Sequence, residues 1–227
     1  MLPEKFTNFL LELFFPKFCF GCQKEGNYLC PDCKSTLEIS SSHKIYSSQN
    51  LKDLYFALNY QSPLIKNLIQ KFKYEPFVRE LAPTLSSLII EHLQLLDNKP
   101  SFKDFTIIPV PLEKRKLKGR GFNQAEEISK ELSSFLAIPL IPNCLIKTKE
   151  TISQVELTNK EERKENIKGV FSIKNGELVK NKKILLVDDV YTTGSTMEEA
   201  ARVLREAGAK EIIGIVIARA RPEDDQF

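Results

Sequence analysis

Two adjacent carboxylates, Asp188 and Asp189, follow an unbroken apolar run in the stretch ILLVDDVYTTGST, which covers residues 184–196. The residues after them are rich in hydroxyl groups and include one glycine, Gly194. Glycine permits positive φ and close approach of an anion, while hydroxyls and the amides of a helix N-terminus bind phosphate oxygens. Carboxylates repel phosphate but accept hydrogen bonds from hydroxyl groups. The pattern therefore predicts a ligand that carries phosphate beside a polyol or a cation, such as a sugar phosphate.

Other interpretations give this stretch a structural role only, or a different nucleotide-binding motif. One aspartate can cap the turn while the other faces solvent, which would leave the carboxylates without a ligand. The loop is not a Walker A motif, because no lysine follows Gly194, and it is not a dinucleotide-binding GxGxxG motif. A sugar phosphate remains the better prediction, because the carboxylates lie between an apolar strand and a helix.

Four of the five cysteines form two CxxC pairs, Cys19 with Cys22 and Cys30 with Cys33. Two such turns supply the four thiolates of a closed structural zinc site, which leaves no open position for catalysis. Iron in a rubredoxin-like site is the competing interpretation, and two unrelated redox-active or buried cysteine pairs are the third. The fifth cysteine, Cys144, lies among apolar residues and is expected to be buried.

The elements around these motifs alternate between buried strands and amphipathic helices, which indicates an α/β fold with a doubly wound parallel sheet. Strands are expected within residues 51–61, 106–111, 182–189 and 211–220, and helices within residues 63–74, 81–96, 122–136 and 195–209, with the last helix beginning near Met197. Ligands of such sheets bind at the carboxyl ends of the strands, where the acidic pair falls.

The composition permits one large domain or one domain with a small appendage, since 227 residues with 42% hydrophobic content can bury an ordinary core. A net charge of +3 argues neither for nor against a nucleic-acid partner. We expect an N-terminal helix and zinc-binding domain over residues 1–50, with a polar connection at 36–50, and a main domain over residues 51–227.

The apolar segment 5–15 contains Glu12, is too short to span a bilayer and precedes no cleavage site of small residues. We expect it to form a short helix that packs on the domain behind it, with membrane or partner contact as the alternative. A cytoplasmic location is the resulting expectation, and it makes stable disulfides unexpected.

Longer stretches carry a family resemblance. The segment VDDVYTTGST resembles the phosphoribosyl pyrophosphate (PRPP) motif of type I phosphoribosyltransferases. Together with the four cysteines, the segments IIPVPLEKRKLKGRGFNQA (107–125) and TISQVELTNKEERKENIKGVF (151–171) resemble, in their residues and in their order along the chain, motifs of the competence protein F (ComF) family. The resemblance covers nearly the whole chain and implies a type I phosphoribosyltransferase-like sheet with a small zinc-binding domain in front.

The resemblance also implies roles for individual residues of the PRPP motif. Asp188 and Asp189 would contact the ribose hydroxyls, and the 5′-phosphate would be held by the hydroxyl-rich loop, which consists of Thr192, Thr193, Gly194, Ser195 and Thr196. In purine-salvage relatives an acid stands at the position of Thr192, and threonine cannot move a proton near neutral pH. Any transfer should therefore use an acceptor that needs little activation, such as ammonia, an amine or an anionic base.

On the pyrophosphate side, the resemblance implies that Val110 and Pro111 form the loop beside the leaving group and that Arg115 and Arg120 contact it. One Mg²⁺ would bridge pyrophosphate and ribose oxygens, because Mg²⁺ prefers oxygen ligands and water. We expect residues 113–121 to form a glycine-hinged basic loop that stabilises the developing charge of pyrophosphate. A merely solvated basic loop is the alternative.

Two functions follow from these expectations. The first is an enzyme that transfers the phosphoribosyl group of PRPP to an unidentified acceptor, with residues 151–166 as an acceptor or lid region. The second is a non-catalytic, zinc-dependent module that binds single-stranded DNA through the zinc knuckle and the basic segment 114–120, with Lys114, Arg115, Lys116 and Lys118 as the residues to test for phosphate contact. The resemblance places either function in DNA uptake or transformation, alongside other competence proteins.

Overall fold

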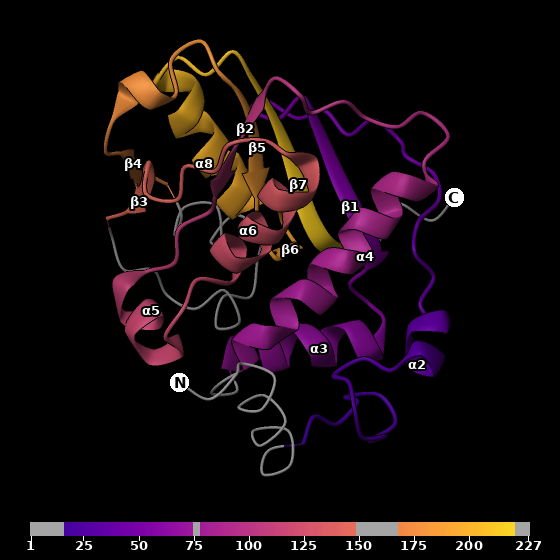
Figure 1. Cartoon of the computed structure of the whole chain (residues 1–227). Coiled ribbons are helices and arrows are strands. Elements are labelled where there is room, and N and C mark those ends of the chain that lie inside the picture. The colour runs from indigo at the N-terminus through magenta and orange to yellow at the C-terminus, as the bar shows by residue number, and fades with distance from the viewer. Residues whose placement is uncertain (1–15, 75–77, 149–167, 221–227) are drawn as a thin grey trace, which may run out of the picture.

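The computed structural model describes residues 16–74, 78–148 and 168–220 (Figure 1). Two predictions lie outside these residues: the short helix at 5–15 and any role of the segment 151–166.

Four parallel strands form the centre of the fold, in the order β1 (Asp53–Asn59), β7 (Glu211–Arg219), β5 (Lys183–Val187) and β2 (Phe105–Pro109). A two-residue strand, β6 (Val190–Tyr191), also pairs in parallel with β7. The carboxyl ends of these strands meet at one edge of the sheet, at the lower side of Figure 1. The predicted parallel α/β sheet is confirmed.

Helices cover both faces of the sheet, which explains why its strands are apolar on both sides. One face packs against α3 (Pro63–Tyr74), α4 (Leu81–Leu95) and α6 (Gln124–Leu136), and the other packs against α8 (Ser195–Glu206). Strand β7 shows the alternation: Ile213, Ile215 and Ile217 belong to the first core, whereas Ile212 and Val216 belong to the second.

A small antiparallel pair, β3 (Leu145–Lys147) with β4 (Phe171–Ile173), packs on the α8 side of the sheet and was not predicted. Cys144, directly before β3, is buried as expected, with 1% of its surface exposed. The shorter helical segments are α2 (Pro31–Ser35), α5 (Lys114–Arg120), η1 (Val78–Glu80) and η2 (Gly176–Leu178).

Two sequence-based expectations near the carboxyl edge were wrong. The basic segment is the helix α5 and not a loop; Gly121, with φ 79°, ends it, and its N–H donates to the carbonyl of Leu117 at 2.8 Å. Positive φ is a usual way to terminate a helix, so the glycine acts as a cap and not as a hinge. Helix α8 begins at Ser195, directly after Gly194, and not near Met197.

The cysteine-containing segment 16–36, which we call the cysteine knuckle, packs on α3 and α4. Leu29 belongs to the same core as these helices, and the Asn67 side chain on α3 donates to the carbonyl of Phe20 at 2.9 Å. Lys34 forms an ion pair with Glu91 of α4 at 2.6 Å. The knuckle is therefore docked on the main sheet domain, and the division at residue 50 stays a prediction.

A search of the described residues for a helix long and apolar enough to cross a membrane finds none.

Candidate functional site

The acidic pair lies where the sequence predicts, directly beyond the carboxyl end of β5. The backbone N–H of Asp188 donates to the carbonyl of Ile215 at 3.2 Å, and the N–H of Ile217 donates to the carbonyl of Asp189 at 3.0 Å. These bonds extend the pairing with β7 through both aspartates. The N–H of Asp189 also donates to Oδ1 of Asp188 at 2.8 Å, so the sheet fixes the position of both carboxylates.

A lysine that the sequence analysis did not identify contacts this pair. Nζ of Lys73, in the last turn of α3, lies 2.8 Å from Oδ1 of Asp189. Both side chains are largely shielded from solvent, with 23% and 11% of their surface exposed. The position of Lys73 follows from the packing of α3 on the sheet, so no local sequence motif announces it.

The two carboxylates have unusual electrostatics. Burial and the neighbouring Asp189 charge raise the pKa of Asp188 to about 7, although Lys73 opposes the shift. Burial alone would lower the pKa of Lys73, but the attraction of Asp189 outweighs it and raises that pKa. The ammonium group of Lys73 is thus charged near neutral pH, while Asp188 takes up and releases a proton there.

The loop after the acidic pair has the conformation that the phosphate-binding prediction needs. Gly194 has φ 80° and caps α8, so the first amides of this helix face the loop. The hydroxyls of Thr193 and Ser195 lie 3.0 Å apart, and Thr192 is exposed. Thr196, in the first turn of α8, is partly buried. The loop 192–196 thus offers hydroxyls and helix amides side by side, close to the carboxylates.

Glycine is required at position 194 for a second reason. A Cβ placed there would lie 2.1 Å from the hydroxyl oxygen of Tyr191. Tyr191 is buried, and its hydroxyl forms a hydrogen bond of 2.8 Å with the hydroxyl of Tyr46. Tyr46 belongs to the segment that joins the cysteine knuckle to β1, so this connecting segment supports the loop from behind.

The predicted pyrophosphate-side loop is the neighbour of the acidic pair. Strand β2 pairs with β5 so that Pro109 lies opposite Val187, and the N–H of Val110 donates to the carbonyl of Val187 at 2.9 Å. The Asn123 side chain donates to the carbonyl of Val110 at 3.0 Å and fastens this turn to the start of α6. Val110 and Pro111 therefore lie at the same edge of the sheet as Asp188.

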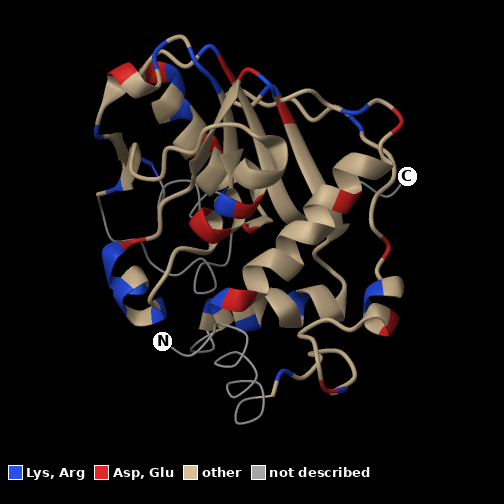
Figure 2. Ribbon diagram, in the orientation of Figure 1, with Lys and Arg blue, Asp and Glu red and all other residues tan. Residues whose placement is uncertain are grey.

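The two predicted arginines on α5 differ in their surroundings. Arg120 donates to the side-chain oxygen of Gln124 at 3.0 Å and lies over the ring of Tyr74, 4.9 Å from its centroid. Tyr74 directly follows Lys73, so Arg120 packs at the end of α3 that carries the lysine of the acidic pair. Arg115 is exposed on α5 and makes no contact with the pair among the described residues. Figure 2 shows α5 as a strongly basic helix beside the carboxyl edge.

Two more ionisable residues near this edge escaped the sequence analysis. Burial, followed by the positive charge of Lys116, lowers the pKa of Lys147 on β3, and the charges of Glu113 and Asp188 oppose this shift. Glu113, just before α5, is buried, and its Oε2 has no hydrogen-bond partner within the described part of the chain. Opposite charges from β3, α5 and β5 thus meet at this edge.

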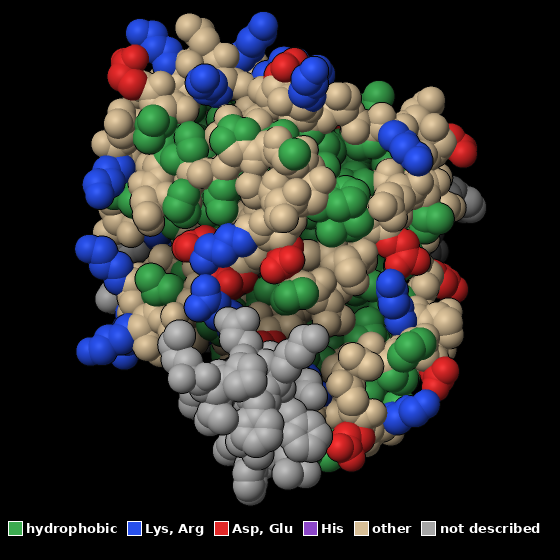
Figure 3. All heavy atoms as spheres, in the orientation of Figure 1, with side chains coloured by type: hydrophobic (Ala, Val, Ile, Leu, Met, Phe, Trp, Pro, Cys, Tyr) green, Lys and Arg blue, Asp and Glu red, His purple; other side chains and the backbone are tan. Residues whose placement is uncertain are grey.

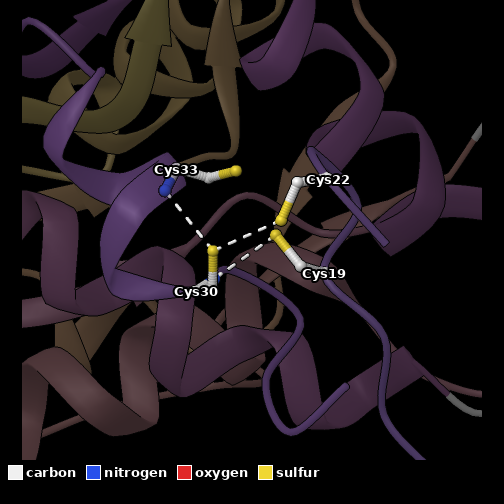
Figure 4. A group of neighbouring side chains, drawn as sticks. All are labelled: Cys19, Cys22, Cys30 and Cys33. Atoms are coloured by element: carbon white, nitrogen blue, oxygen red, sulfur yellow. Dashed lines mark hydrogen bonds between the residues drawn. The ribbon is translucent and has the colours of Figure 1, made fainter. Parts of the chain in front are cut away.

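The four cysteines of the two CxxC pairs converge, as predicted (Figure 4). Their sulfur atoms all lie within 4.8 Å of one another, and those of Cys22 and Cys30 are 3.5 Å apart. Tetrahedral zinc with bonds of about 2.3 Å separates its sulfur ligands by about 3.8 Å, so the cluster fits that ion. Among the described residues it is the one group of three or more metal-binding side chains.

Backbone amides donate to two of the four sulfur atoms, those of Cys19 and Cys30, and so favour the anionic form that metals require. The N–H groups of Gly21 and Cys30 donate to the sulfur of Cys19 at 3.4 and 3.3 Å. Burial opposes ionisation of Cys19, but these amide bonds prevail and lower its pKa to about 6. Gly21 is sterically required, because a Cβ there would lie 2.7 Å from the sulfur of Cys33.

Comparisons with known proteins agree with this architecture. A family model for the phosphoribosyl transferase domain matches residues 117–226. Competence protein F of Haemophilus influenzae is 33% identical over 89% of this chain and 90% of its own. Competence protein ComFC of Streptococcus pneumoniae is 28% identical over 86% of this chain and 84% of its own.

A third relative, DNA utilization protein YhgH of Escherichia coli K12, is 30% identical over 86% of this chain and 85% of its own. These matches cover most of the chain. The chain belongs to the competence protein F family, and it combines a phosphoribosyl transferase domain with a four-cysteine cluster in front of it.

Proposed function

We propose that this protein binds PRPP at the carboxyl edge of its sheet and acts in the handling of incoming DNA. The observation that carries the proposal is the junction of β5 and α8, where the half-buried Asp188 and the buried Asp189 precede a glycine-capped helix N-terminus. The carboxylates Asp188 and Asp189 would accept the ribose hydroxyls, and the loop 192–196 would hold the 5′-phosphate. The names of the relatives, competence protein F and DNA utilization protein, support the biological setting.

The pyrophosphate group would lie toward Val110, Pro111 and the basic helix α5. Of the two predicted arginines we favour Arg120 as the contact to this group, because it packs on Tyr74 at the end of α3, next to Lys73. Bond breaking between ribose C1 and pyrophosphate concentrates negative charge on the leaving group, and cationic side chains stabilise that charge. The acceptor should need little activation, because Thr192 cannot serve as a general base.

Magnesium fits this site only as a partner of PRPP. Two carboxylates are too few for an all-protein Mg²⁺ cage, and among the described residues the cysteines form the one larger cluster of metal-binding groups. Mg²⁺ is ordinarily held by one or two carboxylates together with phosphate oxygens and water. When bound, the ion would neutralise the charge of pyrophosphate, while Asp188 and Asp189 hold the ribose in place.

Calorimetry with zinc-loaded protein tests the proposal directly. We expect PRPP binding that depends on Mg²⁺, and we expect Asp188→Asn with Asp189→Asn to abolish most of it. Asp32→Asn, on the surface of the cysteine knuckle, is the matched control for removal of a carboxylate and should bind as the wild type does. A wild-type protein that binds no PRPP at millimolar concentration would rule the site out. Pyrophosphate release measured across amines, bases and single-stranded DNA would then identify the acceptor.

A second function, binding of single-stranded DNA, is favoured by the surface of α5. Lys114, Arg115 and Lys118 are exposed, and no carboxylate among the described residues lies within ion-pair distance of them. Figure 3 shows Lys and Arg side chains along the side of the molecule where α5 lies. By contrast, Lys24 and Lys34 of the cysteine knuckle form ion pairs with carboxylates. We therefore assign phosphate contact to α5 and not to the knuckle.

Affinity for an oligothymidine measured across salt concentrations tests this assignment. Replacing Lys114, Arg115 and Lys118 together with alanine should reduce the salt slope by about 2, since each lost phosphate contact on a single strand removes about 0.7. Replacing Lys24 and Lys34 with alanine is the matched control and should leave the slope unchanged. Equal effects of the two sets, or an affinity that does not respond to salt, would refute the role of α5.

A further inference from the structure

The ion pair between Lys73 and Asp189 is held rigidly from the lysine side. The residue before Lys73, Phe72, is fully buried, and its carbonyl accepts a hydrogen bond of 3.1 Å from the buried side chain of Gln124. The end of α3 is thus anchored to the start of α6. Because the helix end cannot move away, the ammonium group of Lys73 stays beside Asp189 unless the side chain itself rotates.

The charge of Lys73 changes what the acidic pair can bind. Two ionised carboxylates alone would present a charge of about −2 in a poorly solvated position, which attracts any divalent cation. Lys73 supplies one compensating positive charge at 2.8 Å from Oδ1 of Asp189 and so occupies one of the oxygen atoms that a metal would use. A cation that binds the pair by itself must displace this ammonium group and overcome its repulsion.

We propose that Lys73 is the resident cation of the acidic pair, which keeps divalent cations off the ligand-free pair so that they bind only in company with PRPP. The second half of this inference rests on the proposed function, and the first half concerns the ligand-free protein alone. With PRPP present, the phosphate oxygens supply the metal ligands that the guarded carboxylates do not. Lys73 is a positioning residue in this scheme: it sets the order of binding and lowers the repulsion that a polyanionic ligand meets.

Manganese binding by the ligand-free protein tests the first half. Free Mn²⁺ is measured by electron paramagnetic resonance during titration of full-length, zinc-loaded protein in the absence of PRPP. Removing the positive charge with Lys73→Met should tighten Mn²⁺ binding about tenfold, whereas Lys73→Arg, which keeps the charge, should stay within about twofold of the wild type. Lys73→Gln is a second neutral variant, and it should show the same gain as Lys73→Met.

Two control variants test whether the gain in Mn²⁺ affinity depends on the position of the lost charge and on Asp189. Lys71 lies on the same helix but reaches the ring of Phe20 in the cysteine knuckle, 5.7 Å from its centroid, so Lys71→Met removes an equal charge elsewhere. This variant should bind Mn²⁺ as the wild type does. Adding Asp189→Asn to Lys73→Met should abolish the gained affinity, because the metal would then have lost its carboxylate. An unchanged Mn²⁺ affinity in both neutral variants, or an equal gain in Lys71→Met, would overturn the inference.

A PRPP arm separates this inference from the proposed function. In the wild type, PRPP should raise the apparent Mn²⁺ affinity strongly, and in Lys73→Met the increase should be smaller, because the metal already binds alone. Wild-type protein that shows no response to PRPP would refute the proposed function and, with it, the second half of the inference. The gain in Lys73→Met without PRPP would still establish Lys73 as the resident cation.

Discussion

Replacing Gly194 with alanine tests whether the phosphate loop depends on the backbone conformation and the packing seen in the structure. The residue has φ 80°, which costs a residue with a Cβ about 1–2 kcal/mol. The new Cβ would also lie 2.1 Å from the hydroxyl oxygen and 2.4 Å from Cζ of Tyr191, so the ring must move. Moving this ring breaks its hydrogen bond to Tyr46, which is worth about 1 kcal/mol, and crowds a packed site at a cost of about 1–3 kcal/mol.

We therefore expect Gly194→Ala to lower the free energy of unfolding by about 3 kcal/mol or more. The matched control is Gly208→Ala, since Gly208 also has a positive φ of 91°. A Cβ added at Gly208 would have Lys180 as its nearest neighbour, at the ordinary contact distance of 3.5 Å. That variant should lose only about 1–2 kcal/mol, from backbone strain alone. Urea unfolding of the zinc-loaded proteins measures both values, and calorimetry then compares their PRPP binding. Equal losses of stability in the two variants would refute the role of Tyr191 in shaping the loop.

Four further predictions concern the cysteine cluster, the basic helix and two effects of pH. Gly21→Ala should lower zinc stoichiometry in metal analysis, because its Cβ would lie 2.7 Å from the sulfur of Cys33; full zinc content would show that the knuckle adjusts. Gly119 lies inside α5, with open space where a Cβ would be added, so Gly119→Ala should raise the free energy of unfolding by up to about 1 kcal/mol. A marked loss of stability would contradict the assignment of this segment as a helix. PRPP affinity should rise as pH increases through about 7, because the Asp188 carboxylate acts purely as a hydrogen-bond acceptor only when it is ionised. In Asp188→Asn, PRPP affinity measured by calorimetry should depend less on pH. An unchanged dependence of affinity on pH would exclude Asp188 as its cause. The same raised pKa should make the ligand-free protein lose stability as pH rises from about 4 to about 7, since the folded state holds the proton more tightly.

The sequence predicted the sheet and the convergence of the four cysteines well because both depend on local patterns. Apolar runs identified three of the four main strands, alternation identified the strand within 51–61, and two CxxC spacings identified the four cysteines before any geometry was known. The acidic pair was located for the same reason, since Asp188 and Asp189 follow a strand whose apolar residues predict that it is buried. These signals extend over a few neighbouring residues, so one sequence is enough to detect them.

Contacts between distant segments were out of reach. Lys73 is one of several lysines in an amphipathic helix, and only the packing of α3 on the sheet brings it to Asp189. Similarly, the tyrosine pair that supports the loop joins residues 46 and 191, and no periodicity connects them. Helix α5 was mistaken for a loop because Gly119 and Gly121 suggested flexibility, whereas Gly119 lies within the helix and Gly121 ends it.

Helix α3 also fixes the distance and the relative rotation between the cysteine knuckle and the acidic pair. Its first turns meet the cysteine knuckle through Leu64 and Asn67, and its last turn delivers Lys73 to the acidic pair. Twelve residues span about 18 Å, and each residue turns the helix by about 100°. Inserting or deleting a single residue in its middle would therefore keep either the knuckle contacts or the lysine contact, but not both. The spacing between residues 67 and 73 is thus under a rotational constraint that neither site would impose alone.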